Sequence, residues 1–313
     1  PPPEFKRPGF PESIFQSAIP NSSERVNQPP EFQTLVLPNG EQHKQGVSAV
    51  FDAVASGYDD PALRFFPLCA DRIVKQLRPS RGWRILDVAT GTGALAGALA
   101  QAISSDGRVM AIDLSEGMLA EAKENIEKLA LDNVDFFQMD AEEPEFESDY
   151  FNAVTCSFGL FFIPDMLKAL KQWQRVTQSG GTVLFSSFTE NAFDPLVHVF
   201  IEDLKTFGLD VADKLVAAAR LRDADTCKGL MVAAGFSEVE QNIVQVGYHL
   251  SEAEEWWAAV WNTAMRGLVE QLPQEVQAEF KNAHLKRVAD LKTDDGLWMN
   301  VEVRLTSGVV PFG

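Results

Sequence analysis

Four polar side chains stand at or near the carboxyl ends of successive apolar runs. Asp87 lies near the end of RILDVA, Asp113 ends VMAID, Asp140 follows FFQM, and Ser157 ends the next run. A carboxylate accepts hydrogen bonds from both hydroxyls of a ribose, and a second one accepts from the exocyclic amine of an adenine. Because Asp87 precedes the turn that follows its run, it can face an ammonium group. An aminoacyl nucleoside uses all three contacts.

A glycine-rich turn lies between Asp87 and the apolar helix that starts near Ala94. Gly91 and Gly93 let the backbone of this turn pass close to a ligand, because no Cβ stands in the way. The helix after the turn presents free N–H groups and a partial positive charge to an anionic ligand group. Such turns occur in several nucleotide-binding families, so the turn alone does not choose among them.

Strand-like and helix-like segments alternate around these residues. Because the carboxyl ends of parallel strands share one edge of a sheet, the four polar residues are expected to line one crevice. The alternation predicts an α/β fold with a doubly wound, mostly parallel, seven-stranded sheet of the Rossmann-like type. The expected strands are 83–88, 108–113, 134–139, 151–157 and 181–187, and the expected helices are 93–103, 115–130 and 164–177.

The second half departs from this alternation. Residues 194–235 are expected to form two or three helices, followed by a strand at 237–249 and a last strand at 297–306. Between those strands, residues 251–292 predict a helical insertion before the last strand. Its apolar stripe contains Trp257, Val260, Trp261, Ala264, Met265 and Leu268. The insertion is expected either to cover the crevice as a lid or to pack on the core, with Trp256, Trp257 and Trp261 beside an acceptor pocket in the first case.

The domain limits follow from these patterns. Residues 1–40 hold nine of the seventeen prolines and predict an extended N-terminal arm. Residues 41–250 and 293–313 are expected to form the ligand-binding domain, with 251–292 as the helical lid insertion.

Composition excludes several classes of protein. The net charge of −18 argues against nucleic acid as a partner. No apolar segment reaches the roughly 18 residues of a membrane span, and no secretory signal is visible, so the expected location is the cytoplasm. The three cysteines Cys69, Cys156 and Cys227 are scattered and indicate neither a disulfide framework nor a metal site. A homodimer is left open.

The ordered motifs resemble those of class I S-adenosylmethionine-dependent methyltransferases. More narrowly, they are similar to the ubiquinone/menaquinone biosynthesis C-methyltransferase family over about residues 47–190. The resemblance begins at Val50–Asp59 and continues through the segments LDVATGTGALA, AIDLSEGMLAEAKE, QMDAEEPEFES and SFGLFFIPD.

The resemblance implies S-adenosylmethionine as the cofactor and assigns a role to each motif. The methionine end would lie against Asp87, Ala89, Gly91 and Gly93. The ribose would be held by Asp113. The adenine would contact Leu114, Met118, Asp140 and Ala141. The sulfonium would be flanked by Ser157 and Phe158, and the cofactor would be covered by Phe51 and Tyr58.

The sequence also departs from that family. Its members typically carry a basic and an amide residue after FGL, where this chain has Phe161 and Phe162. An aromatic wall of this kind, with Tyr58 opposite, suits methyl transfer to carbon or oxygen of a small, largely apolar acceptor, quinone-like or a secondary metabolite. Phe161, Phe162, Trp257 and Trp261 are the expected acceptor contacts. His198 is the candidate general base, and Tyr58 the other candidate catalytic residue.

Two other functions remain open from the sequence. Gly91 to Ala96 also fits the loose G-x-G-x-x-G/A pattern of an NAD(P)-dependent oxidoreductase. Asp87 before the turn and Asp140 after the third strand speak against that class. A non-catalytic regulator that binds S-adenosylmethionine is the second alternative.

Overall fold

The computed structural model of the chain describes residues 36–37, 39–209, 211 and 216–312. The predicted proline-rich arm, residues 1–40, lies almost entirely outside the described residues. None of the helices in the described ranges is long and apolar enough to cross a membrane.

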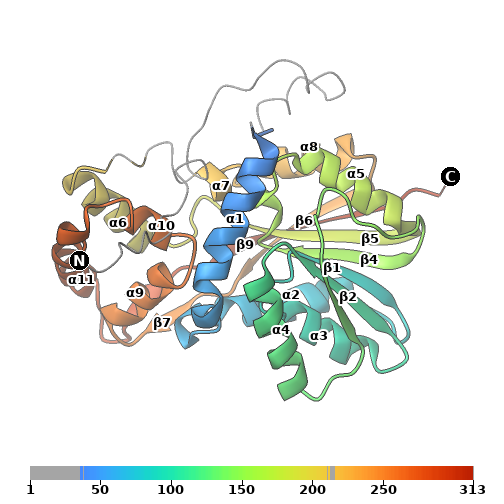
Figure 1. The fold of residues 1–313 in the computed structure, drawn as a ribbon, viewed down its shortest axis with the longest axis horizontal. Helices are drawn as coiled ribbons and strands as arrows, with labels where there is room; N and C mark the ends of the chain where they lie inside the picture. The colour runs from blue at the N-terminus through green and yellow to red at the C-terminus, as the bar shows by residue number, and fades with distance from the viewer. Residues whose placement is uncertain (1–35, 38, 210, 212–215, 313) are drawn as a thin grey trace, which may run out of the picture.

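A seven-stranded sheet with the order β3-β2-β1-β4-β5-β9-β6 forms the centre of the structure (Figure 1). Strands β1 to β5 pair in parallel, whereas β9 is antiparallel to both β5 and β6. The mostly parallel, doubly wound sheet expected from the sequence is therefore confirmed. Its strands are β1 (Arg84–Val88), β2 (Arg108–Asp113), β3 (Val134–Gln138), β4 (Phe151–Ser157), β5 (Thr177–Phe188), β6 (Ser237–Gln245) and β9 (Glu302–Val309).

Helices cover both faces of the sheet, which explains why the central strands are continuously apolar. Ile85, Leu86 and Val88 of β1, for example, are fully buried. One face carries α2 (Phe65–Leu77), α3 (Ala94–Ile103) and α4 (Glu116–Lys128), and the other carries α5 (Met166–Val176) and α8 (Ala224–Ala233), as Figure 1 shows.

Side-chain caps fix where helices begin after the strand ends. Ser115 accepts a hydrogen bond from the N–H of Met118 at the start of α4, and Asp165 accepts one from Lys168 at the start of α5. The Ser115 hydroxyl also donates to Asp52 of helix α1 (Gly40–Val54), at 2.5 Å. This contact ties α1 to the sheet edge where the predicted site residues lie.

The second half differs from the expectation at its strands. The predicted strand 237–249 divides into β6 and the short β7 (Tyr248–Leu250), which pairs with β8 (Leu297–Met299) in a separate two-stranded ladder. The predicted last strand likewise divides into β8 and β9. Gly247 lies at the point of division, where an added Cβ would stand 2.4 Å from the carbonyl oxygen of Met299. The insertion therefore leaves and rejoins the sheet domain through this ladder.

Helices fill the insertion as expected, but not as one continuous stripe. It contains α9 (Ala253–Trp261), α10 (Arg266–Val269) and α11 (Gln274–Ala289), and α6 (Leu196–Thr206) packs against α11 (Figure 1). The short α7 (Val216–Ala219) completes the two or three helices predicted for 194–235. Because α9 ends at Trp261, the tryptophans of α9 and the apolar residues of α10 do not share one face.

A series of buried hydrogen bonds joins the insertion to α6. The indole N–H of Trp256 donates to Nε2 of His284 at 2.9 Å, and Nδ1–H of His284 donates to Asp203 of α6 at 2.6 Å. His284 is fully buried, and this burial lowers the pKa of its imidazole. The ring is therefore neutral in the folded protein at neutral pH.

The neutral state of His284 predicts a stability change in acid. Because the pKa of His284 is lower in the folded than in the unfolded chain, the unfolded chain binds more protons as the pH falls below about 6.5. The free energy of unfolding should begin to decrease as the pH falls through about 7 and should continue to decrease until the pH is below the folded-state pKa, by about 1.4 kcal/mol in all for each unit of difference in pKa. Urea unfolding at several pH values measures this decrease.

The variant His284→Gln is the matched comparison, because glutamine offers an acceptor to Trp256 and a donor to Asp203 without titrating. Its free energy of unfolding should depend less on pH than that of the wild type. Equal pH dependence in the two proteins would show that His284 is not the titrating group.

Candidate functional site

The turn after β1 brings its backbone to the sheet edge in an unusual conformation. Ala89, Gly91 and Gly93 all have positive φ, at 51°, 57° and 85°. Asp87, which precedes the turn, is buried and accepts hydrogen bonds from the hydroxyls of Thr90 (2.7 Å) and Thr155 (2.8 Å). Burial raises the pKa of the Asp87 carboxyl to about 7, although the two hydroxyls oppose this rise.

Asp113 at the end of β2 holds the same turn from the neighbouring strand. One of its carboxylate oxygens accepts from the N–H of Gly91 at 2.9 Å, and the other accepts from the N–H of Ser115 at 3.0 Å. Burial raises the pKa of Asp113, and these backbone donors oppose the rise. Each oxygen keeps a second lone pair for another donor.

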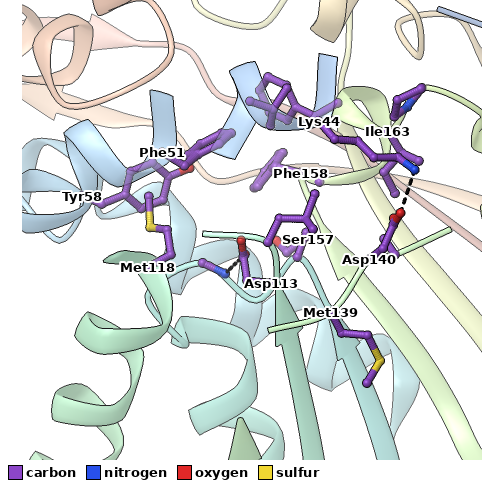
Figure 2. A pocket seen from close by; sticks show the side chains of 18 residues that line it. Lys44, Phe51, Tyr58, Asp113, Met118, Met139, Asp140, Ser157, Phe158 and Ile163 are labelled. Atoms are coloured by element: carbon purple, nitrogen blue, oxygen red, sulfur yellow. Dashed lines mark hydrogen bonds and ion pairs between the residues drawn. The ribbon is translucent and has the colours of Figure 1, made fainter. Parts of the chain in front are cut away.

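Asp140, after β3, is paired with a lysine that the sequence reasoning missed. Lys44 of α1 lies 2.6 Å from Asp140 and 3.1 Å from Glu142, and Figure 2 shows its side chain reaching across to Asp140. Burial alone would lower the pKa of Lys44, but the two carboxylates raise it overall. No motif marks Lys44, which is 96 residues from Asp140 in the sequence.

The turn after β4 passes very close to the turn after β1. Phe158 has a positive φ of 57°, and its N–H donates to the hydroxyl of Ser186 at 3.0 Å. The next residue is Gly159, where an added Cβ would stand 2.5 Å from Cβ of Ala89 and 2.9 Å from Sγ of Cys156. Only glycine fits between these two turns.

These strand ends and α1 enclose a pocket of about 720 Å³ that is open to solvent (Figure 2). In Figure 2, Phe51 and Tyr58 lie together on the opposite side of the pocket from Asp140. The expected cofactor residues that line it are Phe51, Tyr58, Ala89, Gly91, Asp113, Leu114, Met118, Asp140, Ala141, Ser157 and Phe158. Lys44, Val47, Met139 and Ile163 also line it and were not expected.

Two of the expected cofactor residues lie elsewhere. Asp87 lines a smaller hollow beside the pocket, together with Tyr58, Ala89 and Gly91. Gly93 lines neither space and instead caps the start of α3, where an added Cβ would stand 3.2 Å from Cβ of Ala122. Gly93 thus has a packing role between α3 and α4 in this structure.

A second cavity, of about 1050 Å³ and open to solvent, adjoins the first. The two spaces share the side chains of Phe51, Tyr58, Phe158 and Phe162. The second cavity is largely aromatic and aliphatic, and its further lining residues include Leu63, Phe65, Phe66, Phe161, Phe188, Phe193, Val197, Ala259, Ala264, Met265 and Leu268. The expected acceptor residues Phe161 and Phe162 are both present here.

The structure does not bring the other expected residues to this cavity. The side chain of His198 is 64% exposed and pairs with Asp194 at 2.6 Å, because the first turn of α6 points it to solvent. Trp257 and Trp261 stack on each other and line a separate surface hollow with Lys281. The expected general base His198 and the expected acceptor contacts Trp257 and Trp261 are therefore not among the described residues that line the cavity. The insertion reaches the cavity instead with Ala259, Thr263, Ala264, Met265 and Leu268.

The donor set along the pocket and its hollow fits S-adenosylmethionine. The carboxylate of Asp87 stands in the hollow, Asp113 in the middle strand-end position, and Asp140 beyond it, as an ammonium, a ribose and an adenine require. The described residues hold no cluster of three or more groups that could bind a metal ion. The fold and this site define a class I S-adenosylmethionine-dependent methyltransferase.

Comparison with known proteins gives the family. The model of the ubiE/COQ5 methyltransferase family matches residues 39–251, and the chain belongs to this family. The chain is 30% identical over 226 residues to the ubiquinone/menaquinone biosynthesis C-methyltransferase UbiE of Proteus mirabilis, a match that covers 66% of this chain and 88% of that one. It is 34% identical over 145 residues to the aklanonic acid methyltransferase DauC of a Streptomyces species, covering 46% and 66% of the two chains.

Solved structures agree on the fold. The YcgJ protein from Bacillus subtilis superposes with a TM-score of 0.53 at 18% identity, over 78% of this chain and 98% of that chain. A methyltransferase-like protein from Bacillus halodurans gives 0.53 at 21% identity, over 78% and 99%. The chain is an S-adenosylmethionine-dependent methyltransferase, and the comparisons favour neither the oxidoreductase nor the non-catalytic regulator.

The close approach at Gly159 gives a test of the site's architecture. In Gly159→Ala, the new Cβ must push the turns after β1 and β4 apart, which should destabilise the fold by about 1–3 kcal/mol. Thermal unfolding measures the loss of stability, and calorimetric titration with S-adenosylhomocysteine measures the expected loss of affinity.

Gly40→Ala is the matched control, because a Cβ there meets only ordinary contacts, the nearest at 3.7 Å from Pro164. This variant should keep wild-type stability and affinity. A Gly159→Ala protein with wild-type stability and affinity would show that the two turns have room to move.

Proposed function

We propose that the chain transfers a methyl group from S-adenosylmethionine to carbon or oxygen of a small, largely apolar aromatic acceptor. The observation that carries this proposal is the wall of Phe51, Tyr58, Phe158 and Phe162 shared by the two spaces. A donor in the first pocket and an acceptor in the second would meet at this wall. The rings and aliphatic groups that line the second cavity suit a largely apolar aromatic acceptor.

The cofactor contacts follow from the chemistry of each strand end. Asp113 would accept from the ribose hydroxyls with its remaining lone pairs, while its bonds to Gly91 and Ser115 keep the carboxylate in place. Asp87 would face the ammonium group, which favours the ionised carboxyl. Asp140, held by Lys44, would accept from the adenine amine, and Leu114 and Met118 would pack on the ring.

Positioning and exclusion of water are the main contributions of the protein to this reaction. The bound cofactor supplies an electrophilic methyl group on a sulfonium. Phe158 stacks on Phe188 with ring centres 4.4 Å apart, and Tyr58 stacks on Phe66 at 4.7 Å, so the rings at the shared wall are fixed. Aromatic faces attract a nearby cation and keep water away from it. Holding two reactants in line contributes several kcal/mol to catalysis.

The cavity provides no ordinary general base among the described residues that line it, since none is histidine, aspartate or glutamate. Tyr58 does not replace one, because burial, with Asp113 and Asp59 nearby, raises the pKa of its phenol. The acceptor must then be nucleophilic by itself, as an electron-rich ring carbon or an already ionised oxygen is. Tyr58 acts through its ring in this proposal.

The names of the relatives are compatible with such an acceptor. One is a C-methyltransferase of ubiquinone and menaquinone biosynthesis and another is named for aklanonic acid. We further propose a cytoplasmic enzyme without nucleic acid as a partner, on the basis of its three unpaired buried cysteines and its net charge of −18. The β7–β8 ladder supports the division into a sheet domain, 41–250 and 293–313, and an insertion, 251–292. The homodimer stays a prediction.

The role of Asp113 predicts a loss of cofactor affinity. Asp113→Asn removes the charge from the bond to the ribose, which should weaken binding of S-adenosylhomocysteine by about 1.5–3 kcal/mol, or about 10- to 100-fold in Kd. Calorimetric titration measures the change. Asp106→Asn, a charge loss at an exposed position paired with Arg81, should leave the Kd unchanged. An unaltered Kd in Asp113→Asn would remove Asp113 from the ribose site.

The proposed function is tested by product analysis. The enzyme is incubated with S-adenosylmethionine and reduced naphthoquinones or hydroxylated polycyclic aromatics. Release of S-adenosylhomocysteine and a product heavier by one methylene, located on carbon or oxygen by NMR, is the expected result. Absence of turnover across such acceptors, with normal cofactor binding, would contradict the proposal.

A cavity-filling variant shows whether the acceptor uses the second cavity. Ala264→Phe should raise the acceptor KM by about tenfold or more, because a ring then takes up part of the cavity, while the KM for S-adenosylmethionine stays unchanged. Ala278→Phe places the same ring in the surface hollow beside Trp257 and Trp261 and should leave both KM values unchanged. A raised acceptor KM in Ala278→Phe, with an unchanged one in Ala264→Phe, would instead place the acceptor in that hollow.

A further inference from the structure

One charged side chain stands in the otherwise apolar acceptor cavity. Arg222 is the only charged residue among the described residues that line it. It lies two positions before the first residue of α8, and its carbonyl oxygen accepts a hydrogen bond from Arg304 of β9 at 3.1 Å. The backbone that carries Arg222 is therefore fixed to the sheet.

The guanidinium of Arg222 lacks a partner within the described part of the chain. Its Nε is buried without a hydrogen bond, the residue as a whole is half-buried, and no ion pair joins its side chain to another described residue. Its neighbour Arg220 shows the contrast, because that guanidinium donates to the carbonyl oxygens of Phe161, Ile163 and Pro164. Arg220 thus has a structural role, whereas Arg222 lines the cavity without an ion-pair partner among the described residues. A ligand that covers this half-buried arginine would take its charge out of water, so a complementary ligand group gains from pairing with it.

The other polar side chains of the cavity are already engaged. The hydroxyl of Thr189 donates to Glu302 at 2.8 Å, and that of Thr263 donates to the carbonyl oxygen of Ala259 at 2.8 Å. Away from the shared aromatic wall, Arg222 is therefore the side-chain donor still open to a ligand among the described residues. The Nε–H and a neighbouring Nη–H of an arginine form a planar fork that matches the two oxygens of a carboxylate.

We propose that the acceptor of this enzyme is an aromatic carboxylic acid whose carboxylate is anchored by Arg222, while its ring lies against the shared aromatic wall. The inference rests on the proposed function and names the class of acceptor. Arg222 does not line the cofactor pocket, whereas the four aromatic residues of the shared wall do. The anchored carboxylate is thus a recognition group, and the methylated atom lies elsewhere on the acceptor.

Other acceptor classes fit the cavity less well. A fully neutral acceptor would leave the guanidinium uncompensated in an apolar cavity. A phosphate carries up to two charges, and one arginine among apolar side chains would compensate only part of them. A phenolate offers a single oxygen to a fork of two donors. The carboxylate satisfies both charge and geometry.

The experiment compares two ligands of the same shape and different charge. 2-Naphthoate and 2-naphthamide are titrated calorimetrically into the enzyme loaded with S-adenosylhomocysteine. The wild type should bind 2-naphthoate at least about tenfold more tightly than 2-naphthamide, as expected for one charge-assisted pair. Arg222→Met should lose this preference while its affinity for 2-naphthamide stays within about twofold of the wild-type value.

Two variants serve as controls. Arg81→Met removes an exposed arginine that lies just before β1 and pairs with Asp106. This variant should keep the full preference for 2-naphthoate. Arg222→Lys keeps the charge without the fork and should give an intermediate preference, which keeps the test valid if Arg222→Met unfolds. Thermal unfolding and affinity for S-adenosylhomocysteine confirm the integrity of each variant.

Three outcomes would overturn the inference: equal affinity of the wild type for the two ligands, unchanged preference in Arg222→Met and Arg222→Lys, or no binding of either ligand. None of these readouts depends on turnover. A preference for 2-naphthoate that depends on Arg222, in an enzyme that methylates no acceptor, would leave the carboxylate site standing and contradict only the proposed reaction.

Discussion

The contact between the turns after β1 and β4 is the constraint on which both binding spaces depend. Gly159 leaves these turns so close that a single methyl group would collide with Ala89. Ala89 lines the cofactor pocket, and Phe158, the residue before Gly159, lines both spaces. Because the turns are held together, the ring of Phe158 has a fixed place between the two spaces. A looser junction would separate the two reactants by the ångström or so that in-line transfer does not tolerate.

Two carboxylates give the cofactor side of the site its character. Asp87 is buried and Asp113 is half-buried, and each is held by donors from the chain itself, two hydroxyls for Asp87 and two backbone N–H groups for Asp113. Burial raises the pKa of both groups. A cationic, hydroxyl-bearing ligand favours the ionised forms of both carboxyls. The pocket thus selects for the charge pattern of an aminoacyl nucleoside.

The sequence predicted the strand-end residues well because each belongs to a local pattern. An apolar run followed by Asp113 or Asp140 places that residue at the sheet edge, whatever the rest of the chain does. The residues that were missed or misplaced depend on packing between distant segments. Lys44 reaches Asp140 because contacts between distant segments fix α1, among them the bonds of Asp52 to Ser115 and Gly117. Trp257 does not share a face with the apolar residues of α10 because α9 ends at Trp261, a break that helical periodicity does not reveal.

Lys44 and Arg222 together show how an acidic protein can bind an anionic acceptor. The chain carries a net charge of −18, which repels anions at long range. In the cofactor pocket, Lys44 is already neutralised by Asp140 and Glu142, so it offers little attraction to a second anion. Arg222 has no such partner among the described residues and stands in the acceptor cavity. The charge of Lys44 is neutralised, whereas that of Arg222 is not. An acidic acceptor would therefore bind in the second cavity rather than in the cofactor pocket.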